Sequence, residues 1–117
     1  MSSGTHLQSG AGGVIAYEFG TYTVSGNMTH HIVSFQGGTV QCFGVAVSVP
    51  NALTFTDWAN ISNVASMSTT CTYTGTGSGA GSTGTKYNVS ANGVLSLNGT
   101  TLPGATAGTT SLGGQAF

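Results

Sequence analysis

The stretch Thr39–Val49, TVQCFGVAVSV, decides the fold expected for this chain. Apolar and polar residues alternate along it with a period of two, as in a β-strand with one buried face. Alternate positions fall on two faces: Val40, Cys42 and Gly44 on one, and Phe43, Val45, Val47 and Val49 on the other. Gly37-Gly38 precedes the stretch as a turn signal, and Pro50 ends it. We therefore expect the longest and most central strand of the fold here.

Segments on both sides of this strand share its period. Further strands are expected over residues 14–24, 31–35, 53–57 and 69–74, and only Trp58–Met67 could form a helical turn. The pattern predicts an all-β fold, an antiparallel β-sandwich or barrel over residues 14–74. Its expected core is Val33, Phe35, Phe43, Val45, Val47 and Phe55.

The rest of the chain is organised around that sheet in a single domain of 117 residues. Residues 1–13 are interpreted as a Gly/Ser-rich N-terminal arm and residues 75–85 as a flexible Gly/Ser loop. Residues 86–117 are expected to form a β-hairpin meander with a Gly/Thr-rich tail, because Asn92-Gly93 and Asn98-Gly99 suit tight hairpin turns. Both arms carry little apolar surface, so contacts with other subunits are expected to order them.

Charge is almost absent, since Glu18, Asp57 and Lys86 make up 3% of the chain and the formal net charge is −1. Nucleic-acid binding needs clustered Lys or Arg, so it is excluded. No apolar run is long enough for a membrane span, and residues 1–7 do not form a secretory signal. With so few groups for acid–base chemistry we expect no enzyme, no cofactor and no metal site. A surface without charge suits a protein that assembles.

Two kinds of reactive residue deserve consideration. Cys42 and Cys71 lie on predicted strands, and either a disulfide or two reduced buried thiols is compatible with the sequence. His30 and His31 adjoin within a strand, where successive side chains point to opposite faces. These two histidines therefore cannot chelate one metal ion together.

Asparagines and aromatic residues suggest possible contacts with sugars. Asn27, Asn60, Asn88 and Asn98 each begin an N-x-S/T sequon, a mild excess over composition and weak evidence for glycosylation. Trp58, with Tyr17 and Tyr22, could form a sugar-stacking platform. Core or interface aromatic residues are the alternative interpretation, and we favour it.

Residues 87–117, YNVSANGVLSLNGTTLPGATAGTTSLGGQAF, resemble modules of tailed-bacteriophage virion proteins, particularly small capsid decoration (cement) or head-fibre proteins. The resemblance covers about a quarter of the chain. It implies a virion protein made in the host cytoplasm. Such a protein would be a homo-oligomer, often a trimer, bound to a major capsid protein, without catalytic residues.

Two other functions stay open on sequence grounds. One is a subunit of an extracellular pilus or filament, in which an N-terminal arm adds a strand to the next subunit. The other is a carbohydrate-binding module, which would need Trp58 exposed beside tyrosines.

Overall fold

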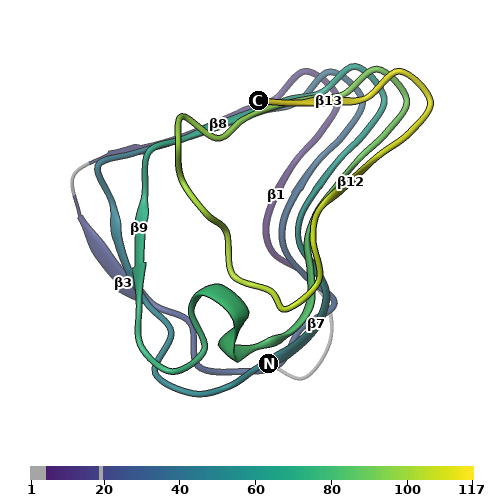
Figure 1. The fold of residues 1–117 in the computed structure, drawn as a ribbon. Coiled ribbons are helices and arrows are strands. Elements are labelled where there is room, and N and C mark those ends of the chain that lie inside the picture. Colours follow the sequence, from purple (N-terminus) through teal and green to yellow (C-terminus); the bar gives the residue numbers. More distant parts are fainter. Residues whose placement is uncertain (1–4, 19) are drawn as a thin grey trace.

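In the computed structural model, which describes residues 5–18 and 20–117, the chain winds into a parallel β-solenoid of about four turns. Figure 1 looks along the solenoid axis and shows successive coils lying almost on top of one another. Every strand pair of the described chain is parallel. The expected antiparallel sandwich or barrel is therefore wrong.

Three sheets line the solenoid: every coil contributes one strand to sheet A and one to sheet B, and the first three coils also contribute one to sheet C. Sheet A contains β1 (Thr5–Ser9), β4 (His30–Ser34), β7 (Thr54–Ile61), β10 (Thr83–Val89) and β12 (Thr109–Thr110). Sheet B contains β2 (Val14–Glu18), β5 (Thr39–Phe43), β8 (Ser66–Thr69), β11 (Val94–Ser96) and β13 (Gln115–Ala116). Sheet C contains β3 (Thr21–Thr23), β6 (Ala46–Ser48) and β9 (Thr72–Thr74). We number the coils 1 to 5 by their sheet A strand.

A repeated turn at the corner between sheets A and B sets the stacking. Its two central residues have positive φ in every coil: Ala11-Gly12, Gln36-Gly37, Asn63-Val64, Ala91-Asn92 and Leu112-Gly113. In coils 1 to 4, the second turn residue donates its backbone N–H to the carbonyl oxygen of the first turn residue in the next coil. The N···O distances are 3.0–3.1 Å. We call this series of hydrogen bonds the corner ladder. Because these bonds join equivalent turns, the chain continues after each turn along a new coil and does not fold back as a hairpin.

The residue that follows each turn is small, and in coils 2, 4 and 5 the backbone of the preceding coil passes close to it. These residues are Gly13, Gly38, Ala65, Gly93 and Gly114. A Cβ built on Gly38 would lie 2.5 Å from the carbonyl oxygen of Ser9 in coil 1. At Gly38, glycine is therefore needed for the close packing of coils 1 and 2.

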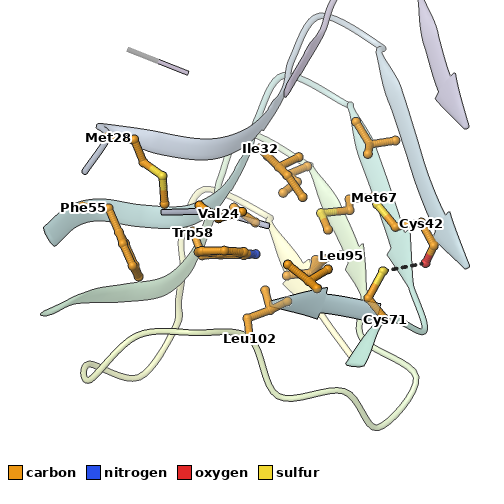
Figure 2. Close-up of a cluster of buried hydrophobic side chains, with 14 of the residues drawn as sticks. Val24, Met28, Ile32, Cys42, Phe55, Trp58, Met67, Cys71, Leu95 and Leu102 are labelled. Atoms are coloured by element: carbon orange, nitrogen blue, oxygen red, sulfur yellow. Dashed lines mark hydrogen bonds between the residues drawn. The ribbon is translucent and has the colours of Figure 1, made fainter. Parts of the chain in front are cut away.

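The core lies inside the coils, and part of it is drawn in Figure 2. Gly44, with a φ of 66°, forms the corner between β5 and β6 and reverses the alternation of side chains there. As a result Val40 and Cys42 share the interior with Val45 and Val47, whereas Phe43 is only partly buried. Val45, Val47 and Phe55 are confirmed as core residues. The same expectation was wrong for Val33, Phe35 and Phe43, which are half-buried.

Several local expectations also need correction. Trp58–Met67 contains the end of β7 and the start of β8, not a helical turn. The Gly/Ser segment 75–85 is packed: it holds a short 3-10 helix, η1 (Gly79–Gly81), and Ser82 accepts the backbone N–H of Leu53. Residues 86–117 form no hairpin, since β10 and β11 belong to different sheets.

The two arms belong to the solenoid itself. β1 pairs with β4, and β12 and β13 pair with β10 and β11, so contacts within the chain order these segments. The expectation that other subunits order them is therefore wrong for residues 5–13 and 105–117. Residues 1–4 of the expected arm and Phe19 of the expected strand lie outside the described residues.

The two ends of the solenoid differ. At the C-terminal end, the chain from Leu97 to Gly108 leaves the path of sheet C and crosses inside the outline of the coils (Figure 1). Leu102 of this crossing segment is buried against the core, with 1% of its surface exposed. At the coil 1 end, a hollow opens among β1, β2 and β3.

Candidate functional site

The hollow at the coil 1 end is the best-formed candidate site. Its volume is about 540 Å³, within the range of small-molecule pockets. It is lined by His6, Leu7, Ile15, Tyr17, Tyr22, Thr23, Val24, Ser25, Gly26 and His31. The lining comes from all three strands of coil 1 and from β4, so the solenoid winding alone assembles it.

A chain of hydrogen bonds runs through this lining. The Nδ1 atoms of His6 and His31 are 2.9 Å apart, and Nε2 of His31 lies 2.8 Å from the hydroxyl of Tyr22. The hydroxyls of Tyr22 and Tyr17 are 3.4 Å apart. His6 and His31 meet because they hold equivalent positions in successive coils, 25 positions apart in the sequence.

The side chains that form this series of hydrogen bonds are uncharged at physiological pH. Burial, and next the proximity of His6, lowers the pKa of His31 to about 3. Burial likewise lowers the pKa of His6 and raises the pKa values of Tyr17 and Tyr22. The hollow therefore offers apolar surface and neutral hydrogen-bonding groups, which fit an uncharged partner.

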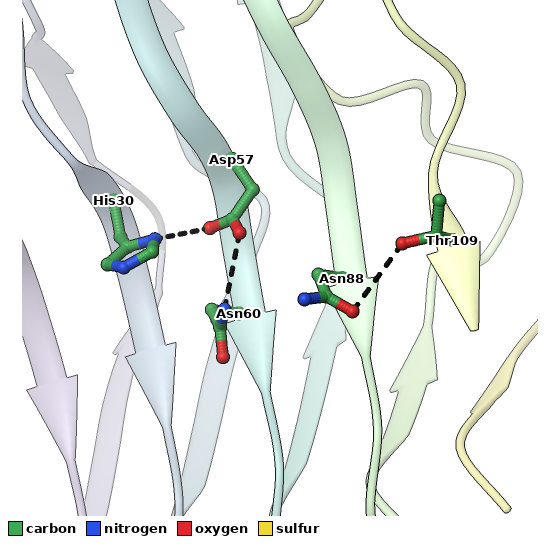
Figure 3. A network of polar contacts seen from close by, with 5 residues as sticks. All are labelled: His30, Asp57, Asn60, Asn88 and Thr109. Carbon is green, nitrogen blue, oxygen red and sulfur yellow. Dashed lines mark hydrogen bonds and ion pairs between the residues drawn. The ribbon is translucent and has the colours of Figure 1, made fainter. Parts of the chain in front are cut away.

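A second polar group lies on sheet A, seen face-on in Figure 3. His30 Nδ1 is 2.5 Å from Oδ1 of Asp57, and Asn60 donates to the other carboxylate oxygen at 3.2 Å. Burial raises the pKa of Asp57, and the hydrogen bond with His30 opposes that shift. Asn88 accepts a hydrogen bond from Thr109 at 3.4 Å. The His30–Asp57 and Asn88–Thr109 contacts join neighbouring coils, whereas Asn60 and Asp57 lie on the same strand.

The two histidines have separate roles, as their adjacency predicted. His30 contacts Asp57, while His31 lies between Tyr22 and Trp58. Within residues 5–18 and 20–117, no three His, Cys, Asp or Glu side chains are grouped to hold a metal ion.

The structure brings the two cysteines together. Cys42 and Cys71 are both buried free thiols, and Cys71 Sγ donates to the carbonyl oxygen of Cys42 at 3.4 Å. They come from coils 2 and 3, so a link between them would join successive coils.

The aromatic residues do not form a sugar platform around Trp58, whose side chain has 0% of its surface exposed. It packs in the core against His31, Phe55 and Tyr73. Tyr17 and Tyr22 line the hollow at the coil 1 end instead. The sequence pattern indicated both tyrosines but did not predict their contacts with His6 and His31.

The four sequon asparagines are distributed over the surface. Asn27 and Asn98 are exposed, and Asn60 and Asn88 are half-buried on neighbouring strands. Asn27 accepts the backbone N–H of Thr54, and Asn98 donates to the carbonyl of Thr69. Their side chains thus contribute contacts between coils.

Comparisons with known proteins identify no relative. No family model, no curated protein and no solved structure matches the chain. In the described residues, no helix has the length and apolar character needed to cross a membrane. Arguments about function therefore rest on the site and the fold.

Proposed function

We propose that this chain is a non-enzymatic structural protein of a virion, of the capsid decoration or head-fibre kind, whose copies stack head to tail. The observation that carries the proposal is the corner ladder. Its first acceptor, the carbonyl of Ala11, and its last donor, the N–H of Gly113, have no partner among the described residues. A second copy placed along the axis would join this donor to this acceptor.

The turns at the two ends match in sequence. Ser111-Leu112-Gly113-Gly114 corresponds to Gly10-Ala11-Gly12-Gly13, with positive φ at the same two places. Continuing the register in this way places Ala116 of one copy beside Ile15 of the next. Because stacking by translation preserves strand direction, sheets A and B would continue as parallel sheets.

The hollow supports the same contact. Its apolar lining is open at the coil 1 end, and the crossing segment of a second copy would cover it. That segment presents small exposed residues at Thr101 and at 105–107. Burial of apolar surface and new backbone hydrogen bonds would supply the affinity.

A structural role fits the way the chain uses its few titratable groups. His31 packs against Trp58 of the next coil and is neutral. Asp57 is held by His30 of the preceding coil and by Asn60 of its own strand, and Lys86 donates to the carbonyl of Gly104 in the crossing segment at 2.5 Å. The contacts of His31, His30 and Lys86 therefore connect coils or close an end. The virion assignment is supported by the resemblance of residues 87–117.

Stacking would also serve an extracellular filament. Donation of the N-terminal arm to a neighbour is not favoured, because Thr5–Ser9 already pairs with β4 of its own chain. Co-purification of the protein with a capsid supports the virion assignment, whereas filaments free of capsid protein support the alternative.

Sedimentation velocity over a range of protein concentrations tests the stacking. Wild-type protein is expected to form oligomers without a single closed size, because head-to-tail contacts need not close. Ile15→Glu should abolish them, since a carboxylate hydrated at the open end would be buried in the stack. Ala46→Glu, exposed on β6 in coil 2 and away from both ends, is the matched control and should assemble normally. Wild-type protein that stays monomeric at every concentration contradicts the proposal.

A further inference from the structure

The two thiols occupy adjacent coils at one corner of the solenoid. Cys42 lies in β5, and Cys71 lies in the corner between β8 and β9. Cys71 Sγ lies 3.4 Å from the carbonyl oxygen of Cys42, to which it donates, and each thiol shifts the pKa of the other. Figure 2 shows both side chains at one side of the core.

Cys71 adjoins a hollow, whereas Cys42 is completely buried. Because the crossing segment leaves the path of sheet C, β9 has no strand on its C-terminal side in the described chain. A hollow of about 480 Å³ lies there and is lined by Cys71, by hydroxyl-bearing residues and by Asn98. Cys71 is 3% exposed, and Cys42 is completely buried. A small reagent that enters this hollow meets Cys71 first.

The surroundings of Cys71 favour its ionised form. Hydrogen bonds from the thiol of Cys42, from Thr69 and from the backbone at Val45 and Thr70 face its sulfur. Led by the contact with Cys42, they lower the pKa of Cys71 to about 6, although burial acts in the opposite direction. The thiolate is the nucleophilic form of cysteine.

Cys42 has the opposite character. The hydrogen bond with Cys71, and then burial, raises the pKa of Cys42, so it stays protonated. The other titratable groups around the pair are the hydroxyls of Tyr17, Tyr22 and Tyr73. Burial raises their pKa values, so they are uncharged at physiological pH. Cys42 is therefore placed as the second thiol of the pair.

We propose that Cys71 is a modification site for small disulfides, and that Cys42 resolves the product into a disulfide between coils 2 and 3. In the first step the Cys71 thiolate attacks one sulfur of a disulfide such as oxidised glutathione. A bond forms between Cys71 and that sulfur, and the other half leaves as a thiolate. Cys42 then loses its proton and attacks Cys71, releasing the second half as a thiol. Two protein thiols are oxidised, and one small disulfide is reduced to two thiols.

The experiment treats the full-length folded protein with oxidised glutathione and follows the mass of the intact chain. Wild-type protein is expected to lose two hydrogens and retain no glutathione. Cys42→Ala should accumulate one glutathione, mapped by peptide analysis to Cys71. Cys71→Ala is the matched control and should stay unmodified. Cys42→Ser serves as a second variant where Cys42→Ala does not keep the wild-type circular dichroism spectrum.

A second readout is the pH profile of iodoacetamide labelling at Cys71. Wild-type labelling should reach half its maximal rate near pH 6. In Cys42→Ala this midpoint should shift toward the ordinary thiol value of about 8.5. Glutathione on Cys42, a disulfide that forms only in denaturant, or an unchanged midpoint in Cys42→Ala would overturn the proposal.

Discussion

His31 packs against Trp58 with the ring centroids 4.2 Å apart and the ring planes tilted by 36°, and the two residues come from successive coils of the solenoid. His6 continues the series into coil 1, with its ring 5.1 Å from that of His31. Contacts of this kind run along the axis, so each coil is stabilised by the coil beside it. The corner ladder does the same for the backbone.

Acid should destabilise the fold through His31. The pKa of His31 is about 3 in the folded chain, against an ordinary 6.5. Between pH 3 and pH 6.5 the unfolded chain therefore binds a proton at His31 and the folded chain does not. Stability is complete above pH 6.5 and falls as the pH drops toward 3, by up to about 1.4 kcal/mol per pH unit.

His31→Phe keeps an aromatic ring on Trp58 and removes this proton. Urea unfolding at several pH values should show a flatter pH dependence for His31→Phe than for wild type between pH 3 and 6.5. Equal slopes for the two proteins would mean that His31 titrates normally in the folded chain.

Two neighbouring glycines should tolerate alanine very differently. A Cβ on Gly37 meets open space, so Gly37→Ala should cost about 1 kcal/mol, from its φ of +74°. A Cβ on Gly38 meets the backbone of Ser9 in the preceding coil, so Gly38→Ala should cost roughly 3 kcal/mol. Chemical denaturation measures both changes. Equal losses would contradict the close approach of coils 1 and 2.

Val64 is expected to be a strained residue. It is 70% exposed and has a φ of 55°, a conformation unfavourable for a β-branched side chain. Val64→Asn should raise stability by about 1 kcal/mol, because asparagine tolerates this region better. Val14→Asn, equally exposed but in β2, is the control and should bring no gain. A gain of the same size in both variants would point to solubility rather than backbone strain.

The reversal of side-chain alternation at Gly44 predicts unequal effects on its two neighbours. Val45→Asp buries an unpaired charge and should cost several kcal/mol, whereas Phe43→Asp, at a half-buried position, should cost less. Thermal melts followed by circular dichroism compare them. The face assignment fails if Val45→Asp melts like wild type.

Part of this fold is predictable from the sequence. Period-two alternation located part of the strands, and Gly37-Gly38, Asn92-Gly93 and Asn98-Gly99 all mark real turns. It was wrong in treating Thr39–Val49 as one longest strand, because Gly44 divides it into β5 and β6 and β7 is longer, and it missed β1 and β8. Alternation carries no information on strand direction, however, because parallel and antiparallel strands bury alternate residues alike. Turns with positive φ suit hairpins, and here the same geometry forms the corner between two sheets.

The missed signal is a repeat. Ser9–Gly13 reads SGAGG and Ser34–Gly38 reads SFQGG, and both precede a short apolar strand. Coil 3 breaks the motif with Asn63-Val64-Ala65, and coil 4 keeps only its final glycine. A search for internal repeats would have found the first pair and suggested a solenoid.

The candidate site was less predictable than the fold. His6, His31 and Tyr22 are far apart in sequence and meet only through the stacking of coils. The tyrosines were selected for their aromatic character, without a reason to join them to a histidine. Cys42 and Cys71 were named as a possible pair, but their proximity depends on the coil register.

The central claim is that copies stack head to tail, and one mixing experiment tests it most directly. Ile15→Glu blocks the coil 1 end and leaves the other end intact, while Thr110→Glu, exposed on β12, blocks the opposite end. Each variant alone should sediment as a monomer, and an equimolar mixture should form a dimer through the two intact ends. Monomers in the mixture, or oligomers of Thr110→Glu alone, would contradict head-to-tail stacking.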